Sequence, residues 1–339
     1  MKTRARAAIP RAKRNAGITL LEMLLVMAIL AVVLGSGVGM FGALDLGRRQ
    51  TAGLVRSVVR SAQNTAVARQ VPARVRIDVK NHTIRAEALQ VVGTWHFENK
   101  KIAGFGMEGS AASELFHDEG FIGSAISFVR SFGERALIPV QLDPAFDFTD
   151  GFAIECALRW EDAGGGRVLR IGNVLMLELG RSGALRGRFS AAVEEGGEFR
   201  RGPPVVVQSG SGAVSPDKWV RVRFQYDRQE LVLLVDGVAV AVLEETAPVW
   251  EISEPLEISD GTRPFPGSID ALVISAVEVD RVVELPDSAT FAKETPEWIH
   301  FASGGGLDRR RHPEPQEIVL NYEDGSQERI AVGIFGTVE

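Results

Sequence analysis

Residues 14–30, RNAGITLLEMLLVMAIL, join a basic leader to a long apolar run. From Ile18 to Leu44 the only ionisable side chain is that of Glu22. At about 1.5 Å of rise per residue, a helix over this run is long enough to cross a hydrocarbon layer about 30 Å thick. A carboxylate inside such a span is costly unless it finds a partner, which makes Glu22 a candidate functional residue.

Two plainer explanations of this stretch fit less well. A secretory signal peptide would have a shorter apolar region followed by a small-residue cleavage site, and Gly42-Ala43 is a poor site of that kind. An ordinary single-span anchor explains the apolar length but predicts no acid at Glu22. The leader contains six cations and no acid, so the positive-inside rule keeps it cytoplasmic and exports the rest of the chain.

The motif Gly17-Ile18-Thr19-Leu20-Leu21-Glu22, followed by Met23 and Leu24, resembles the N-terminus of type IV prepilins and type II secretion pseudopilins. The resemblance implies that a membrane peptidase removes the leader, residues 1–17, by cutting after Gly17. It further implies that Ile18 becomes the methylated N-terminal residue and that Glu22 supports assembly.

The same resemblance implies where the protein acts and what it contacts. The expected location is the bacterial inner membrane, as a single-pass protein whose C-terminal domains are periplasmic or extracellular. The expected partners are other pseudopilins or pilins, the prepilin peptidase and an inner-membrane assembly platform.

The helix is predicted to continue beyond the membrane run, so that residues 18–70 form one element. Its second half is amphipathic, because apolar residues follow helical spacing there. Pro72 ends the helix, since it pushes Val71 out of helical geometry. The apolar stripe consists of Val55, Val58, Val59, Ala62 and Ala66.

Short alternating strands are predicted at both ends of the remaining chain, in residues 71–90 and 286–339. The later strands, residues 299–301, 318–320 and 330–332, are separated by glycine-containing turns and followed by Gly336-Thr337-Val338. This arrangement resembles the two halves of an H-type minor pseudopilin, whose long helix packs on a small antiparallel sheet. The two segments are therefore expected to form one split sheet against the helical stripe.

Residues 91–285 contain many short strands with turn signals between them, the pattern of a two-sheet sandwich. Asp236-Gly237 between apolar strands is a strong hairpin signal. Together with the late segment 265–270, FPGSID, the strands resemble the laminin G-like, concanavalin A-like jelly roll. The predicted fold class is α+β, with a pilin helix, a small antiparallel sheet and an inserted all-β jelly roll.

Composition restricts the chemistry. Removing the six leader cations leaves 32 basic and 44 acidic residues, a formal charge of −12 that argues against nucleic-acid binding. Cys156, the single cysteine, alternates with polar or small neighbours and fits a buried strand position. Neither zinc-ligand spacing nor a phosphate-binding glycine motif is present, so we expect no cofactor and no metal.

Catalysis is not expected. The segment 278–284 superficially matches the E-x-D-x-x-x-E pattern of glucanases with a jelly-roll fold, which need two carboxylates across a substrate cleft. It is expected after the last core strand, where such a pattern has no role. Calcium binding has five candidate donors whose spacing forms no contiguous loop, so solvated turns are favoured. These donors are Asp143, Asp147, Asp150, Asp260 and Asp270.

Carbohydrate binding has three candidate aromatic platforms, Trp95, Trp160 and Trp250, although Trp95 and Trp219 fit core positions. The run 308–312, DRRRH, is expected to be a solvated loop, with a docking patch as the alternative. The preferred interpretation is a non-enzymatic, membrane-anchored pseudopilin-like subunit that displays the jelly roll as a binding or spacer module. The alternative is a carbohydrate- or protein-binding adhesin that uses the pilin segment only for export and anchoring.

Overall fold

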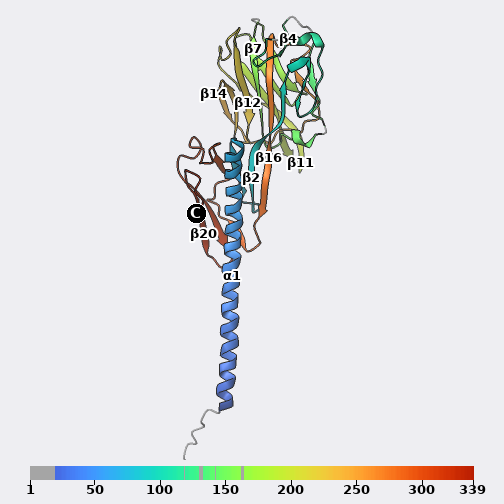
Figure 1. The fold of residues 1–339 in the computed structure, drawn as a ribbon. Coiled ribbons are helices and arrows are strands. Elements are labelled where there is room, and N and C mark those ends of the chain that lie inside the picture. The colour runs from blue at the N-terminus through green and yellow to red at the C-terminus, as the bar shows by residue number, and fades with distance from the viewer. Residues whose placement is uncertain (1–19, 118, 130–132, 142, 162–163) are drawn as a thin grey trace, which may run out of the picture.

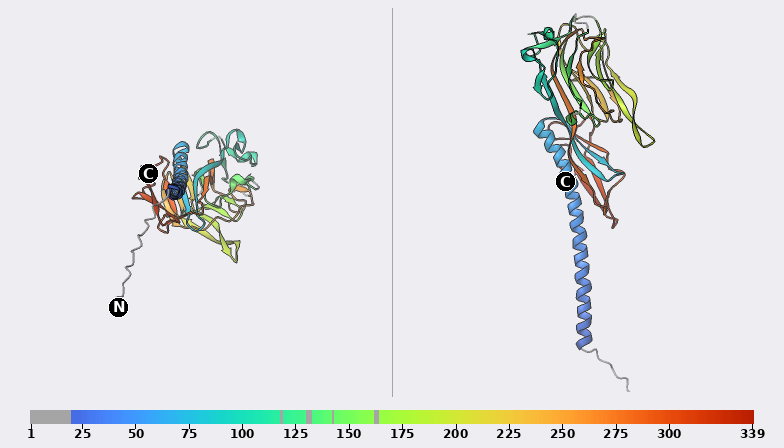
Figure 2. Two further views of the ribbon diagram at one scale, coloured as in Figure 1. Left: turned by 90° about the horizontal axis from the view of Figure 1, so that it is seen from below. Right: turned by 90° about the vertical axis from the view of Figure 1, so that its right-hand side faces the viewer.

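The computed structural model describes residues 20–117, 119–129, 133–141, 143–161 and 164–339, without the side chains of Glu22 and residues 31–46. A long N-terminal helix leads into two β-rich lobes that follow one another along its direction (Figure 1). The helix lobe packs against one face of the C-terminal half of the helix, and the sandwich lobe lies beyond the end of that helix (Figures 1 and 2).

Helix α1 runs from Leu20 to Arg69 and has 50 residues. It ends one residue before the predicted end at Gln70, because Gln70 adopts a positive φ of 54° shortly before Pro72. The predicted stripe is confirmed: its five members, with Ala52, are completely buried against the helix lobe. The amphipathic half of α1 is therefore held by packing and not by helix propensity alone.

The largest sheet within the described residues has 11 strands and passes through both lobes. The main path has the order β14-β13-β12-β7-β16-β2-β1-β18, with β3, β4 and β5 attached to its side. Its strands are β1 (Ala73–Asp78), β2 (Thr83–His96), β3 (Ala103–Phe105), β4 (Phe116–His117), β5 (Ala125–Ser127), β7 (Phe152–Trp160), β12 (Trp219–Tyr226), β13 (Glu230–Val235), β14 (Val238–Glu244), β16 (Gly267–Glu284) and β18 (Trp298–Phe301).

A six-stranded antiparallel sheet faces it and completes the jelly-roll sandwich. Its order is β11-β10-β9-β8-β15-β6. Its strands are β6 (Ala136–Ile138), β8 (Gly166–Ile171), β9 (Leu175–Leu179), β10 (Leu185–Glu195), β11 (Glu198–Gln208) and β15 (Leu256–Ile258). Three short 3-10 turns lie in the connections: η1 (Glu98–Lys100), η2 (Ser113–Leu115) and η3 (Pro144–Phe146).

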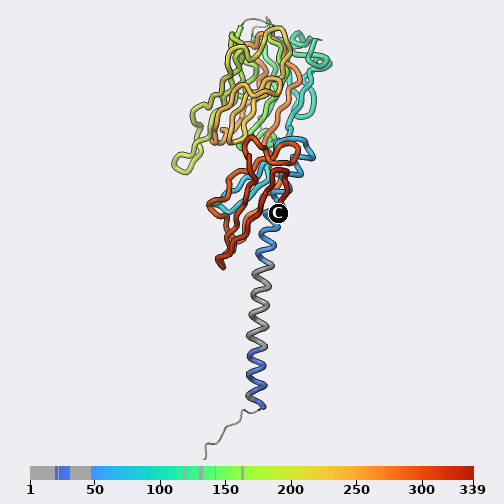
Figure 3. The backbone as a smooth tube through the Cα atoms, turned by 90° about the vertical axis from the view of Figure 1, so that its left-hand side faces the viewer, coloured from blue at the N-terminus to red at the C-terminus, as the bar shows by residue number. Residues whose placement is uncertain are grey.

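The C-terminal strands do not all join one sheet with the strands after α1, as the sequence suggested. Only β18 pairs with β1, whereas a separate three-stranded sheet has the order β17-β19-β20. Its strands are β17 (Ala289–Phe291), β19 (Gln316–Tyr322) and β20 (Gln327–Val332). Both sheets nevertheless contribute to one core with α1, and the C-terminal strands lie beside the upper part of the helix (Figure 3).

Two long strands connect the lobes. Strand β2 has 14 residues and β16 has 18, and they pair antiparallel from Leu272 opposite Trp95 to Glu284 opposite Thr83. Register shifts after Ile274 and Val279 mark β-bulges, which bend a strand and increase its twist. The lobes are thus joined by paired strands and not by flexible linkers (Figure 1).

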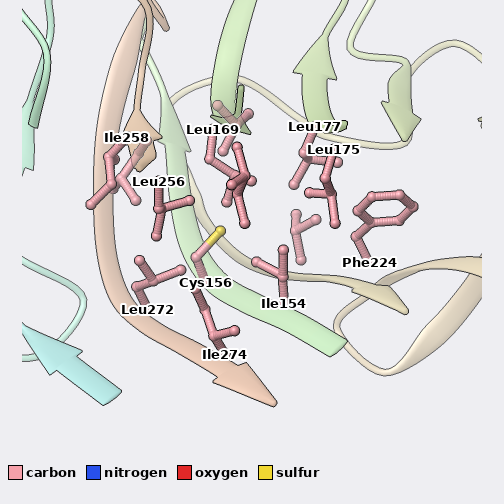
Figure 4. Close-up of a cluster of buried hydrophobic side chains, with 14 of the residues drawn as sticks. Ile154, Cys156, Leu169, Leu175, Leu177, Phe224, Leu256, Ile258, Leu272 and Ile274 are labelled. Carbon is pink, nitrogen blue, oxygen red and sulfur yellow. The ribbon is translucent and has the colours of Figure 1, made fainter. Parts of the chain in front are cut away.

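Each lobe has its own hydrophobic core. The sandwich core lies between the two facing sheets, where Cys156 and Ile154 from β7 meet Leu169, Leu175 and Leu177 (Figure 4). Burial raises the pKa of the Cys156 thiol to about 12, as expected for an unreactive core residue. The helix-lobe core is a separate cluster.

The predicted hairpin at Asp236-Gly237 is confirmed. These two residues alone join β13 to β14, and both have positive φ angles, 49° and 81°. Such angles suit the two-residue turn that matches the twist of the flanking strands.

We predict that Ile330→Ala lowers the free energy of unfolding by about 2–5 kcal/mol, because Ile330 is completely buried in the helix-lobe core. The matched change Val282→Ala, on a strand residue that is 58% exposed, should cost less than about 0.5 kcal/mol. Urea unfolding of residues 45–339, followed by near-UV circular dichroism, measures both. Equal losses would contradict the assignment of Ile330 to a core.

Candidate functional site

The residues predicted to be cleaved and methylated, Gly17 and Ile18, lie outside the described residues. Glu22 belongs to α1, as its third residue, but its side chain is not described. Of the predicted sites, only the assembly residue Glu22 can be placed: its backbone lies at the free end of α1, far from both lobes (Figure 1).

The first turns of α1 present apolar side chains that touch neither lobe. Leu20 is 80% exposed, Leu21 76% and Met23 65%, and residues 24–30 continue the same surface. Large apolar side chains exposed over several turns mark a surface that associates with lipid or another chain. A search confined to the described residues finds no helix with an apolar window long enough to span a membrane.

The prediction that the E-x-D-x-x-x-E segment follows the last core strand is wrong, because the segment is the second half of β16 itself. Glu278 accepts a hydrogen bond from Arg69 at 2.9 Å, and Asp280 accepts one from Thr65 at 2.5 Å. The Arg69 guanidinium also lies 3.5 Å from Asp280. These carboxylates fasten the C-terminal end of α1 to β16 and do not face each other across a cleft.

The candidate calcium donors occupy ordinary turn and ion-pair positions. Asp143 accepts the backbone N–H of Ala145 and caps η3, while Asp147 accepts both the N–H and the hydroxyl of Thr149. Asp150 lies between two arginines at the junction of the lobes. Across the described residues, no group of three or more His, Cys, Asp or Glu side chains is arranged to hold a metal ion.

The other two aspartates are buried. Burial alone would raise the pKa of Asp260, but hydrogen bonds from Thr262 and Arg167 outweigh it and hold that pKa well below its usual range. Asp270 accepts the backbone N–H of Ile122, yet burial dominates and raises its pKa. Both carboxylates are explained by contacts within the chain.

Two of the three candidate sugar platforms are core residues. Trp95 is completely buried, Trp160 is 6% exposed, and both donate their indole N–H to backbone carbonyls. Trp250 is half-buried against the sandwich core. Trp219, expected in the core, instead lies on the outer face of the sheet, where it meets Phe121 edge to face at 6.1 Å.

The strongest polar cluster of the described chain lies where the lobes meet, around the Arg74–Glu87 ion pair. The two groups are 2.7 Å apart, and their side chains are only 5% and 0% exposed. Arg74 also donates to the backbone carbonyls of Asp227 and Asp150, which belong to the sandwich lobe. One guanidinium from β1 therefore contacts one oxygen of a buried acid and two carbonyls of the other lobe, while Oε1 of Glu87 is buried without a hydrogen-bond partner in the described structure.

A second layer surrounds this pair. The Asp150 carboxylate accepts from Arg76 at 3.2 Å and from Arg228 at 3.1 Å. The indole ring of Trp298 lies under two guanidinium groups, with Arg74 at 4.6 Å and Arg76 at 5.0 Å from its centroid. A cation over an indole face is attracted by the ring quadrupole, so Trp298 supports the same arginines.

The expectation of a solvated loop at 308–312 is wrong for Arg311 and His312, whereas Arg310, at 53% exposure, is solvated as expected. Arg311 is 12% exposed and donates to Asp227 at 2.8 Å and to Glu230 at 2.7 Å, and Arg310 donates to Glu230 at 2.5 Å. Because Asp227 and Glu230 flank the β12–β13 turn, the loop clamps the helix lobe to the sandwich. The alternative, a docking patch, agrees better with the structure, although the surface that the loop contacts belongs to the sandwich lobe of the same chain.

His300 is buried inside this clamp. Its ring stacks between Trp298 and His312, with centroids 6.2 and 5.7 Å away. Burial is the main reason that the pKa of His300 lies far below its usual range, and the charges of Arg311 and Arg74 add to it. His300 is thus a neutral imidazole at the joint.

A cavity of about 520 Å³ lies at the end of the sandwich, between the loop after β6 and residues 251–253. Its lining includes three carboxylates, Asp143, Asp147 and Glu251. Two of them already cap turns, so they are not free to orient toward a ligand.

Sequence reasoning missed the joint because its members are far apart in the chain. Arg74 and Arg76 alternate with the apolar residues of a predicted hairpin strand, which favours its solvent face, and no motif marks Asp227 or Glu230. The only local signal was the arginine run at 309–311, whose charge indicated a partner surface.

Comparison with known proteins identifies the N-terminal motif. Residues 12–38 match the prokaryotic N-terminal methylation motif, which confirms the predicted motif and indicates membrane anchoring by this segment. The match covers less than a tenth of the chain and leaves the lobes unassigned. A search of curated proteins finds no match.

Among solved structures, domain 4 of the arabinanase AbnA from Geobacillus stearothermophilus is 13% identical, with a TM-score of 0.38, over 56% of this chain and 93% of that one. The binding domain of Paraclostridial Mosquitocidal Protein 1 is 12% identical, with a TM-score of 0.43 and coverages of 54% and 48%. Domains LG4-5 of the mouse laminin α1 chain are 16% identical, with a TM-score of 0.32 and coverages of 43% and 39%. At these values, what those proteins bind or cleave says nothing about this chain.

We predict that Arg74→Met and Glu87→Leu each lower the free energy of unfolding by about 3–5 kcal/mol, because each leaves a buried charge unpaired. The double variant should lose less than the sum of the two, since neither charge then remains. The exposed pair Arg329–Glu317, at 62% and 51% exposure, is the matched control and should show a coupling below about 1 kcal/mol. Additive losses at Arg74 and Glu87 would show that the pair is not formed.

We predict that acidification weakens the joint through His300. Its folded-state pKa lies below that of the unfolded chain, about 6.5, so only the unfolded chain gains a proton as the pH falls past that value. The free energy of unfolding should drop by up to about 2 kcal/mol between pH 6.5 and 5.0 from this group. His300→Gln should remove that part of the pH dependence. Parallel pH profiles for the two proteins would exclude this role.

Proposed function

We propose that this chain is a membrane-anchored pseudopilin-like subunit of a type II secretion pseudopilus or type IV pilus. The observation that supports this most directly is the methylation motif at residues 12–38, placed on a 50-residue helix. The first turns of that helix are apolar and exposed, while its second half is buried in the helix lobe. A subunit that assembles through its N-terminal helix needs an exposed apolar first half for contacts with other subunits and a second half that packs on its own domain.

In this proposal the leader, residues 1–17, is removed after Gly17, and Ile18 becomes the methylated N-terminus. Glu22 is four residues along the chain from the new terminal amine, and we propose it as the charge partner of that amine at the membrane edge. A charge pair in low dielectric is much stronger than the same pair in water, and removing one member leaves the other unpaired.

The remaining chain is proposed to be a split pseudopilin domain, residues 71–90 and 286–339, interrupted by a jelly-roll insert at 91–285. The core assignments suggest an earlier end for the insert, since Ala276 packs in the sandwich core and Leu285 in the helix-lobe core. The sandwich then acts as a binding or spacer module, held at the end of α1 that is remote from the membrane (Figure 2). Its proposed setting is the bacterial inner membrane, with both lobes outside the cytoplasm.

We predict that co-expression with a prepilin peptidase converts the chain to a form that begins at Ile18, as shown by intact-mass analysis. Gly17→Leu should block the cut, because a larger residue then precedes the scissile bond. Glu22→Ala should still be cut and anchored but should not enter filaments, whereas the isosteric control Leu21→Met should assemble normally. An uncut wild-type chain, or normal assembly of Glu22→Ala, would contradict the proposal. Cleavage and anchoring without any assembly in the native host would favour the adhesin alternative.

A further inference from the structure

The outer face of the six-stranded sheet has an excess of positive charge in a chain that is acidic overall. Seven arginines project from it or reach onto it, against three carboxylates. We call this surface the arginine face. The arginines are Arg135, Arg167, Arg170, Arg186, Arg188, Arg201 and Arg263, and the carboxylates are Glu178, Glu257 and Asp260.

Strand geometry explains why these side chains share one face. In β10, Leu185 and Phe189 are buried in the sandwich core, so Arg186 and Arg188 point outward by alternation. In β8 a register shift between Arg167 and Leu169 marks a bulge, and both residues that follow Arg167 are buried. The bulge therefore returns Arg170 to the face that Arg167 occupies.

The arginines form a regular array. Arg186 and Arg167 both face Glu178 in the pairing register, one on each side of β9, so they are about 10 Å apart at strand spacing. Arg186 and Arg188 are separated by about 7 Å along their strand. Met176 of β9 lies between Arg188 and Arg170 and is only 3% exposed, because arginine stems cover it.

The carboxylates on this face are already shared among several arginines. Glu178 lies within 4.0 Å of Arg167, Arg186 and Arg263. Each remaining carboxylate is likewise engaged by two arginines. These contacts are Glu257 with Arg170 and Arg135, and Asp260 with Arg167 and Arg170.

Arg188 has neither a hydrogen-bond nor an ion-pair partner within the described part of the chain, and its Nε atom is shielded from solvent without an acceptor. Burial is the main reason that the pKa of Arg188 is lowered. The charge of Glu178 opposes this shift, and the positive charges of Arg167, Arg186 and Arg201 add to it. Arg201 donates only to neutral acceptors, the hydroxyl of Ser190 and the carbonyl of Asn173. A half-buried guanidinium whose shielded Nε has no acceptor is costly, and the Glu178 carboxylate is already shared by three other arginines, so this part of the face favours an anion.

We propose that the arginine face binds a polysaccharide with carboxylate groups, a polyuronate, with Arg186 and Arg188 at the centre of the site. Planar guanidinium groups donate paired hydrogen bonds to carboxylates. The hydroxyls between successive carboxylates of such a polymer donate to Glu178, which separates the arginine rows. This proposal rests on the proposed function, in which the sandwich is a binding module, and it adds the chemical class of the ligand that the sandwich binds.

The face suits duplex DNA less well. DNA presents a charge about every 1.7 Å along its axis, so phosphates would meet Glu178 and Glu257 as well as the arginines. A broad sheet face also does not enter the major groove, which admits a helix or a two-stranded ribbon. The formal charge of −12 on the chain without its leader opposes non-specific attraction to nucleic acid.

The test measures binding of the detergent-solubilised full chain to polygalacturonate, with dextran of similar length as the neutral polymer. Binding should be specific for polygalacturonate and should weaken as salt is raised, because the contacts are ionic. Arg186→Ala with Arg188→Ala should weaken binding at least about tenfold, since charge-assisted hydrogen bonds are lost. Arg200→Ala, at the exposed tip of the β10–β11 hairpin, is the matched control and should bind normally.

If the double variant does not fold, the single variant Arg186→Glu replaces it, because the Arg186 side chain is 49% exposed and the change should not disturb the core. Arg186→Glu should also weaken polygalacturonate binding. Absence of polygalacturonate binding, equal binding to dextran, or unchanged binding by both variants would overturn the proposal. Tighter binding to a duplex oligonucleotide than to polygalacturonate would also overturn it. Because the purified chain is measured without assembly, failure here is distinguishable from failure to enter a filament.

Discussion

The lobes depend on one constraint, the uninterrupted pairing of β2 with β16 through both of them. Each strand supplies side chains to the sandwich core at one end and to the helix-lobe core at the other. Relative movement of the lobes must therefore bend or break a paired strand, and not merely straighten a linker. This is why a domain that looks like an insertion along the chain is a continuation of the same sheet in space (Figure 1).

The ion network at the joint follows from that constraint. Continuous strands bring β1 and the loop at 308–312 against the β12–β13 turn, so polar groups at the contact lose water and need partners. Arg74 and Arg311 provide them, each by contacting acids or carbonyls that come from the sandwich. Buried ion pairs add little net stability but strongly disfavour other arrangements, because those leave a charge unpaired. The network therefore specifies orientation more than it stabilises the fold.

Local periodicity was enough to predict α1, its buried stripe, the Asp236-Gly237 hairpin and the core position of Cys156. It was not enough for residues 278–284, which were expected to follow the last core strand. These residues extend β16 because they pair with β2, and β2 is almost 200 residues earlier in the chain. The same limit applies to the joint and the arginine face. Arg311 and Arg188 each follow another arginine closely in sequence, yet Arg311 is paired across the lobes and Arg188 has no ion-pair partner in the described structure. Only the register of the sheets distinguishes them.

The sandwich is held in a fixed position relative to α1, and a distance measurement between the two lobes tests this most directly. Replacing Cys156 with Ala and introducing Ser182→Cys and Glu323→Cys places one spin label on an exposed position of each lobe. Double electron–electron resonance should then give a single narrow distance distribution that broadens when Arg74→Met and Arg311→Ala are added. A broad distribution in the otherwise unaltered chain would show that the lobes move independently and would contradict the account.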